Sequence, residues 1–427
     1  MCYKRGDMNR KIKVVWICEF SNSIVRSHLS FRNDYLDSFV RKLFHKQSMK
    51  NTDYGIWNTN GIEEIKKYSE IELFVVSPHY HIKGNEQRFD QEGIHYLFFN
   101  DEKNSLVFHF TSMVQKNKRK EFKHNRKIIK KYIEEIKPDI VHVIGAENPH
   151  YSLSALDVSS NLPVIVQLQT LVCDPEFIKK YPKYSKFNID CEKKVLLRAN
   201  YIGTTIKKYR SIINEMINPN ANFLGLKLAV GSNVRPINVH KEYDFIYFSV
   251  NINKAFDLAI EAFALAHQEH PEITLCVVGY YSPEFKDGVD KRIKELGVEK
   301  SVFFQGHQPT HDDVLTWVAK CRFALLPLKF DNVSTTIREA MSLGVPVITT
   351  ITSGTPSLNE KRQSVLLSKI NDHAALADNM KKLLLDDELA KTISENAIET
   401  VKEQYDNSKF MKEWVITYCN LVRNESK

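Results

Sequence analysis

Short apolar runs alternate along the chain with segments whose apolar residues repeat at helical spacing. In the first half, the apolar runs are Lys13–Cys18, Ile71–Val76, Asp139–Gly145 and Leu162–Leu168. The segment from Asn125 to Lys137 has the helical repeat instead, and Pro138 ends it. Strands that alternate with helices in this way predict a parallel sheet whose strands are joined by crossover helices.

The alternation stops in a less regular stretch between Asn218 and Glu242 and then begins again. Further strands are predicted at residues 245–250, 273–279, 301–304, 323–328 and 345–350. A helix is predicted at residues 255–267, with an apolar side made of Phe256, Ile260, Phe263, Leu265 and Ala266. From Ala374 onward the pattern predicts helices, and the apolar face of the last helix is predicted to hold Phe410, Trp414, Ile416 and Leu421.

Together these patterns predict an α/β protein with two Rossmann-like domains. The first is predicted to span residues 1–235 and the second residues 236–405. A helix at residues 406–427 is expected to cross back and pack on the first domain. The length of 427 residues agrees with two domains, because single hydrophobic cores stop growing at about 250–300 residues.

Composition favours a cytosolic protein without disulfides. No apolar run approaches the ~18 residues of a membrane-spanning helix, and Met1–Arg10 lacks the apolar core of a signal peptide. The 7 cysteines are odd in number and include no CxxC pair. A disulfide framework or a structural zinc site is therefore not expected, and reduced, buried thiols are.

The net charge of +8 is concentrated in one basic stretch, Lys118–Lys131. One interpretation is a solvated helix face. The other is a patch that contacts anionic lipid headgroups, which would place the protein at the inner face of the membrane. No nucleic-acid recognition motif accompanies the charge, so nucleic acid is not expected as a partner.

The segment from Phe323 to Glu360 carries the most chemistry. A buried strand leads into the polar loop Lys329–Thr336, and a helix follows until Gly344. In a parallel sheet such a loop lies at the ligand-binding edge, where the free N–H groups of the helix suit a phosphate. Ser334, Thr335 and Thr336 allow close approach and can cap the helix. The alternative is a plain capping loop followed by a surface glutamate.

This segment resembles a motif of family 4 retaining glycosyltransferases. The resemblance lies in Asp331, seven intervening residues and the run Glu339–Ile348, similar to that family's acidic-x7-Glu pattern. Phe248–Ala255 resembles the loop in which an Arg and a Lys hold the donor diphosphate, and Phe304–His307 resembles the segment near the base pocket. The resemblance covers residues 245–400 well and implies the GT-B fold, in which two Rossmann-like domains face each other across a cleft.

The first domain resembles, more weakly, bacterial transferases that assemble surface polysaccharides. The similar segments are Trp16–Asn22, Val141–His150 and Val164–Gln169. The resemblance implies that His150 points into the cleft and that Glu147 orients an acceptor hydroxyl. The alternatives are a loop histidine bonded to backbone and a surface glutamate.

Three residues depart from the family pattern. Asn251 stands where the family usually has Arg, Asp331 replaces the first Glu, and Gln169 stands near a position where many relatives carry His. The missing cation at position 251 puts donor affinity in doubt, and it leaves open a catalytically weak or inactive partner protein. A sugar-nucleotide epimerase or phosphorylase of the same architecture is also left open.

The resemblance implies a hexosyltransferase that uses a nucleotide diphosphate sugar as donor and retains the anomeric configuration. The acceptor is expected to be a hydroxyl of a glycan or of a lipid-linked molecule, and neither a metal nor another cofactor is expected. The implied catalytic residues are Asp331, Lys254 and His150. The implied substrate-binding residues are Asn251, Gly279, Tyr280, Gly306, His307, Ser334, Thr335, Thr336, Glu339 and Glu147. Uridine and guanosine donors both remain open.

Overall fold

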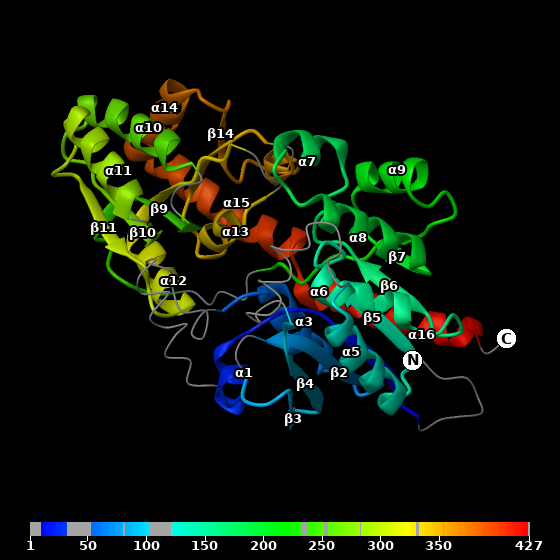
Figure 1. Cartoon of the computed structure of the whole chain (residues 1–427). Helices are drawn as coiled ribbons and strands as arrows, with labels where there is room; N and C mark the ends of the chain where they lie inside the picture. The colour runs from blue at the N-terminus through cyan, green and yellow to red at the C-terminus, as the bar shows by residue number, and fades with distance from the viewer. Residues whose placement is uncertain are drawn as a thin grey trace. The chain divides into compact units, whose positions relative to one another are not determined.

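The computed structural model describes residues 10–31, 53–79, 82–102, 121–231, 237–251, 255–281, 283–329, 333–352 and 354–425. The chain divides into two compact units, each built around its own sheet (Figure 1). Unit 1 comprises Met1–Ala229 and Asn407–Lys427, and unit 2 comprises Val230–Asp406.

The sheet of unit 1 has eight strands in the order β3-β4-β2-β1-β5-β6-β7-β8. Neighbouring strands are parallel except for β3 and β4, which are antiparallel. The strands are β1 (Ile12–Ile17), β2 (Ile71–His79), β3 (Glu86–Gln91), β4 (Ile94–Asn100), β5 (Ile140–Ile144), β6 (Val164–Gln167), β7 (Tyr201–Gly203) and β8 (Asn222–Leu224).

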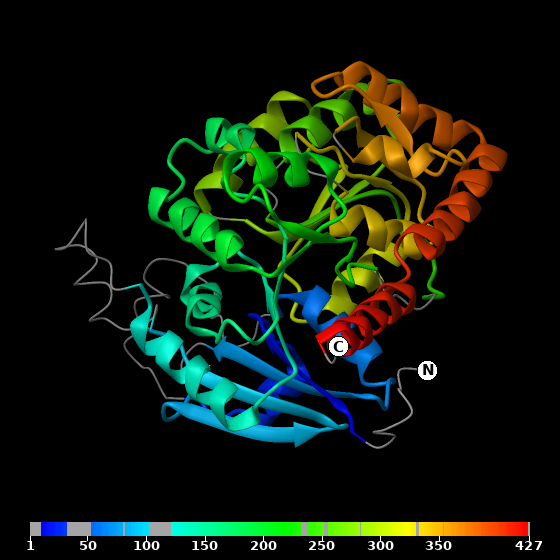
Figure 2. The same cartoon turned by 90° about the vertical axis from the view of Figure 1, so that its right-hand side faces the viewer.

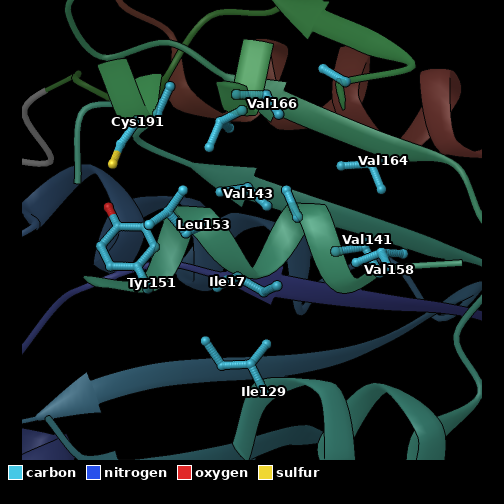
Figure 3. Close-up of a cluster of buried hydrophobic side chains, with 14 of the residues drawn as sticks. Ile17, Ile129, Val141, Val143, Tyr151, Leu153, Val158, Val164, Val166 and Cys191 are labelled. Carbon is cyan, nitrogen blue, oxygen red and sulfur yellow. The ribbon is translucent and has the colours of Figure 1, made fainter. Parts of the chain in front are cut away.

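Helices cover both faces of this sheet. They are α1 (Ser23–His28), α3 (Ile56–Ile65), α5 (Lys123–Ile136), α6 (Pro149–Ser152), η3 (Leu153–Asp157), α7 (Pro175–Lys180), α8 (Lys186–Arg198), α9 (Lys207–Met216) and α16 (Asn407–Glu425). Because successive strand residues point to opposite faces, the central strands contribute to two apolar layers. Figure 3 shows one layer, in which Val143 of β5 and Val166 of β6 gather with Leu153 of η3 and Ile129 of α5.

The last helix, α16, packs on the other face of unit 1, beside α3 (Figure 2). Its Tyr418 hydroxyl accepts a hydrogen bond from Trp16 Nε1 at 2.9 Å and lies 2.6 Å from His142 Nδ1. Trp414 stacks on His142 with a ring-centroid distance of 4.4 Å. These buried hydrogen bonds and ring contacts therefore hold α16 on the first sheet.

The sheet of unit 2 is parallel throughout and has six strands in the order β11-β10-β9-β12-β13-β14. The strands are β9 (Tyr243–Asn251), β10 (Leu275–Tyr280), β11 (Val302–Gly306), β12 (Cys321–Leu325), β13 (Val347–Thr350) and β14 (Leu366–Ser368). The helices are α10 (Phe256–Glu269), α11 (Pro283–Glu295), α12 (His311–Ala319), α13 (Thr335–Ser342), η5 (Thr355–Asn359), α14 (His373–Leu385) and α15 (Asp387–Gln404).

Alternating residues again separate two layers in unit 2. Phe245 and Tyr247 of β9 pack with α10 and α14, whereas Ile246 and Phe248 pack with α13 and α15. Both faces of the sheet are therefore buried, as continuous apolar strands predict.

The predicted strands are present, with ends shifted by a few residues. The strand predicted to reach Leu328 ends at Leu325, because Pro327 cannot donate a hydrogen bond to a neighbouring strand. Two residues predicted to face the core, Leu265 and Ile416, are exposed. Ile416 follows Trp414 by two residues, and two helical steps turn the side chain to the opposite face.

β4 was not predicted, although it contains the apolar run Tyr96–Phe99. The other strands that were not predicted are either short or polar. β7, β8 and β14 have three residues each, and β3 reads Glu-Gln-Arg-Phe-Asp-Gln. Such segments lack an apolar run, so only their neighbours in the sheet make them strands. Cys18, Cys173, Cys191, Cys276 and Cys321 are free and buried, as predicted. Cys419 is disulfide-bonded, which contradicts the prediction of reduced thiols at that position.

Candidate active site

The carboxyl edge of the second sheet contains a topological switch point. β9 comes first in the chain, and its neighbours β10 and β12 lie on opposite sides of it. Ligands of such sheets bind at the edge where the strand order reverses. The loops that follow β9 and β12 are the ones that hold Lys254 and Asp331. Both residues lie outside the described part of the chain, as does the side chain of Asn251.

The start of α13 has the capped geometry that the sequence predicted. Ser334 is the N-cap, and its Oγ accepts a hydrogen bond from Ile337 N at 3.3 Å. The same Oγ lies 2.9 Å from Thr336 Oγ1. The N–H groups of the first helical turn have no carbonyl partner within the helix, so this end suits an anion.

Arg338 is a part of this region that the sequence interpretation missed. Its guanidinium is buried, donates to Val333 O at 2.6 Å and to Thr335 Oγ1 at 3.0 Å, and lies over the ring of Tyr405. These contacts hold the backbone on which the helix begins. Arg338 lies one turn into the predicted helix, and this position was the signal in the sequence that could have placed it near the capping loop.

Glu339 is buried and therefore is not the surface glutamate of the alternative interpretation. Its Oε1 lies 3.1 Å from Nε2 of His311, the first residue of α12. The sequence did not identify His311, because the pair joins two helices that are distant along the chain. Binding of a ribose by Glu339 remains a prediction, and such a ligand would have to share the carboxylate with this imidazole.

Two glycines end neighbouring strands at the same edge. Gly279, the second-last residue of β10, has a φ of +142°, and Gly306, the last residue of β11, has a φ of +70°. These backbone angles favour glycine. The strand register pairs Tyr280 with Asn251 and Val278 with Gly306, and the next residue, His307, is exposed. The predicted donor residues that the structure describes thus share one edge.

The first sheet has a matching switch point between β1 and β5. Glu19 follows β1 and His150 follows β5, and Glu19 Oε2 lies 3.0 Å from His150 Nε2. The His150 side chain is thus paired with a carboxylate. Asn125 donates from its amide to His150 O at 2.8 Å and to Asp101 Oδ1 at 2.8 Å, which fixes the loop. Glu19 was not named as a site residue, although it directly follows the first buried strand.

Glu147 is buried beside this pair, which contradicts its alternative interpretation as a surface residue. Its Oε1 accepts a hydrogen bond from Asn148 Nδ2 at 3.0 Å. With its amide nitrogen toward Glu147, Gln169 donates to the same oxygen at 2.9 Å and accepts from Trp57 Nε1 at 3.2 Å. Burial raises the pKa of Glu147 to about 8, with a contribution from the charge of Glu192. Glu147 is therefore mostly protonated at neutral pH.

Gly145 lets this loop close tightly. Its φ is +102°, and a Cβ at this position would lie 2.5 Å from the Tyr151 hydroxyl.

Among the described residues, no three His, Cys, Asp or Glu side chains gather as ligands for a metal ion. In that same part of the chain, no helix is long and apolar enough to span a membrane.

Sequence comparison finds a match in the second unit. Residues 233–400 match the family described as "Glycosyl transferases group 1". A segment of 166 residues is 30% identical to N-acetyl-α-D-glucosaminyl L-malate synthase of Bacillus anthracis. That segment makes up 39% of this chain and 42% of the relative, so the match spans about two fifths of each protein.

Solved structures match nearly the whole chain. Sucrose-phosphate synthase from Thermosynechococcus elongatus superimposes with a TM-score of 0.67 at 14% identity, over 97% of this chain and 100% of that one. Anabaena HepE in complex with UDP gives a TM-score of 0.61 at 14% identity, over 96% and 100% of the two chains. At this identity the likeness shows the fold, and it confirms the predicted GT-B class.

Proposed function

Because residues 233–400 match the family described as "Glycosyl transferases group 1", we propose that this protein is a retaining glycosyltransferase. It moves a hexose-type sugar from a nucleotide diphosphate sugar to a hydroxyl of a glycan or lipid-linked acceptor. The observation that carries the proposal is the capped start of α13, which follows β12 at the switch point of the second sheet. A helix start at that edge binds phosphate through backbone N–H groups.

Unit 2 binds the donor in this proposal. The diphosphate is a leaving group whose negative charge grows in the transition state. Lys254 and the N–H groups near Thr335 and Thr336 stabilise that charge without a metal ion. Asp331 holds the transferred sugar, and Glu339 holds the ribose. The leaving phosphate takes the proton of the acceptor hydroxyl, so no covalent nucleophile is assigned.

Unit 1 binds the acceptor, near Glu147 and His150. The protein works in the cytoplasm, at the inner face of the membrane when its acceptor is lipid-linked. Two of the described lysines of the basic stretch have carboxylate neighbours, since Lys131 lies 3.1 Å from Glu86 and Lys130 lies 3.8 Å from Glu134. Because salt screens exposed charges, any electrostatic attachment through this stretch should weaken with salt.

A screen of nucleotide sugars by thermal shift tests the donor site first. A ligand at 100 times its Kd stabilises the folded protein by ~2.7 kcal/mol. Uridine and guanosine diphosphate sugars should raise the unfolding temperature to different extents. Without any stabilisation by a nucleotide diphosphate, an inactive partner protein would fit better.

Product analysis then tests the chemistry. The stabilising donor, labelled in its sugar, is incubated with neutral glycan acceptors, and the anomeric configuration of the product is read by NMR. Retention with net transfer is expected. Conversion of the donor in the absence of any acceptor would instead indicate an epimerase, and nucleotide bound over residues 15–30 would reverse the roles of the units.

A further inference from the structure

Glu19 is the reachable member of the carboxylate–imidazole pair in unit 1. The side chain of His150 is 3% exposed, whereas that of Glu19 is 18% exposed. A ligand at the switch point between β1 and β5 would therefore meet the carboxylate before the imidazole.

We propose that Glu19 binds the acceptor through its hydroxyl groups, and that the part of the acceptor at this edge carries no negative charge. The inference rests on the proposed function, since it places the acceptor in unit 1. An ionised carboxylate has acceptor oxygens only, and sugar hydroxyls are matching donors. A phosphate or carboxylate on the ligand would face a like charge instead.

The other charged groups described at this edge support an uncharged ligand. Asp101 adds a second buried carboxylate, with an oxygen 3.8 Å from His150 Nε2. His150 is engaged by Glu19, and Arg26 is engaged by Asp53 at 2.7 Å. Neither of these two side chains is thus left to balance a bound anion, and burying an unbalanced charge is costly.

His150 is a positioning residue in this arrangement. Its carbonyl is held by Asn125, and its ring lies edge-on to Tyr151 at 4.9 Å and to Phe122 at 6.1 Å. The ring therefore has little freedom, and Nε2 directs one oxygen of Glu19. Another side chain that donates a hydrogen bond to Glu19 from a similar position should therefore replace His150 in part.

Binding of matched neutral and charged sugars tests the inference on the full-length protein. Methyl glucoside, methyl galactoside and methyl N-acetylglucosaminide are each compared with their 6-phosphates by calorimetry, with UDP present. At least one neutral glycoside should bind about tenfold or more tighter than its phosphate, because a hydrogen bond to a charged group is lost and a repulsion added. The inference is overturned if no neutral glycoside binds or if the phosphates bind equally well.

Glu19→Gln separates a binding role from a structural one. The variant should weaken the neutral glycoside about tenfold while binding its 6-phosphate better than the wild type does, because the repelling charge is gone. A loss of folding cannot produce that gain. Asp90→Asn is the matched control, since Asp90 forms a carboxylate–imidazole pair with His95 at 2.8 Å near the amino end of β4. It should change neither affinity.

Replacement of His150 tests the positioning role. His150→Gln keeps a donor near Glu19 and should bind the neutral glycoside within about threefold of wild type, whereas His150→Ala should match Glu19→Gln. Equal losses in both His150 variants would contradict a positioning role. UDP binding reports on unit 2 separately, so a protein that fails to bind UDP refutes the proposed function, whereas one that binds UDP without discriminating the sugars refutes only this inference.

Discussion

The two units each carry a carboxylate–imidazole pair at the sheet edge, but the pairs are oriented in opposite ways. In unit 1 the imidazole of His150 is 3% exposed and the carboxylate of Glu19 is 18% exposed. In unit 2 the imidazole of His311 is 35% exposed and the carboxylate of Glu339 is 6% exposed. The more exposed member of the pair is therefore the carboxylate in unit 1 and the imidazole in unit 2.

This difference agrees with the division of substrates that we propose. Unit 2 adds the start of α13 to its more exposed imidazole, and the N–H groups of the helix start favour a negatively charged ligand. Unit 1 adds buried carboxyl groups to its exposed carboxylate, and these favour hydroxyl donors. The same two side-chain types thus serve different ligands, according to which of them the fold buries.

The largest effect is expected from the cation of the donor loop. Lys254→Ala should weaken binding of the donor diphosphate by ~1.5–3 kcal/mol, the worth of one charge-assisted contact. Asn251→Arg should strengthen it by adding back a cation. Calorimetry with UDP and GDP measures both. Unchanged affinity in both variants would mean that this loop does not touch phosphate and that the contrast between the units rests on α13 alone.

Acid should destabilise unit 1 through His142. Burial lowers the pKa of His142 to about 3, and Tyr418 contacts its Nδ1. Because the unfolded chain binds this proton more readily, stability is present above the unfolded pKa of ~6.5 and falls as the pH drops, by ~2 kcal/mol between pH 7 and pH 5. Hydrogen exchange of α16 measures the loss.

His142→Phe serves as the control for that experiment. Phenylalanine keeps the stack on Trp414 and cannot titrate, so its α16 should exchange at a rate less sensitive to pH. An acid response of the same size in this variant would assign the effect to other groups in unit 1.

Glu339→Gln should mainly raise the KM for the nucleotide sugar, by ~1–2 kcal/mol in binding, because the ribose does not react and is held equally in the ground and transition states. Asp331→Asn should instead lower kcat, since that carboxylate orients the reacting sugar. Steady-state kinetics of both variants measure KM and kcat. A lower kcat in Glu339→Gln together with a higher KM in Asp331→Asn would assign the sugar to Glu339 and the ribose to Asp331.

The smallest effect concerns Glu147. Its pKa of about 8 lies above that of an unfolded glutamate, so its contribution to stability is full in acid and is lost as the pH rises. Between pH 7 and pH 9 the wild type should lose ~1 kcal/mol relative to Glu147→Gln, which stays neutral. Thermal unfolding at the two pH values measures the difference. An equal loss in both proteins would show that Glu147 is ionised already.

The donor unit was more predictable than the acceptor unit, for a physical reason. Phosphate binding by a helix start needs only residues that are consecutive in the chain, and Ser334 caps α13 as the local pattern predicted. The acceptor edge depends on residues brought together by the sheet. Glu19 and His150 are separated by 131 positions, and no local spacing relates them.

By itself, the sequence determined the alternation of strands and helices, the two-unit α/β architecture and the capped loop before α13. Apolar periodicity and helix capping are properties of neighbouring residues, so a linear chain displays them. Only the tertiary structure decided which partner each charged side chain meets, and therefore which member of each carboxylate–imidazole pair is buried. Burial depends on every element packed around a group, and the packing leaves Glu19 the more exposed member of its pair in unit 1 and His311 the more exposed member in unit 2.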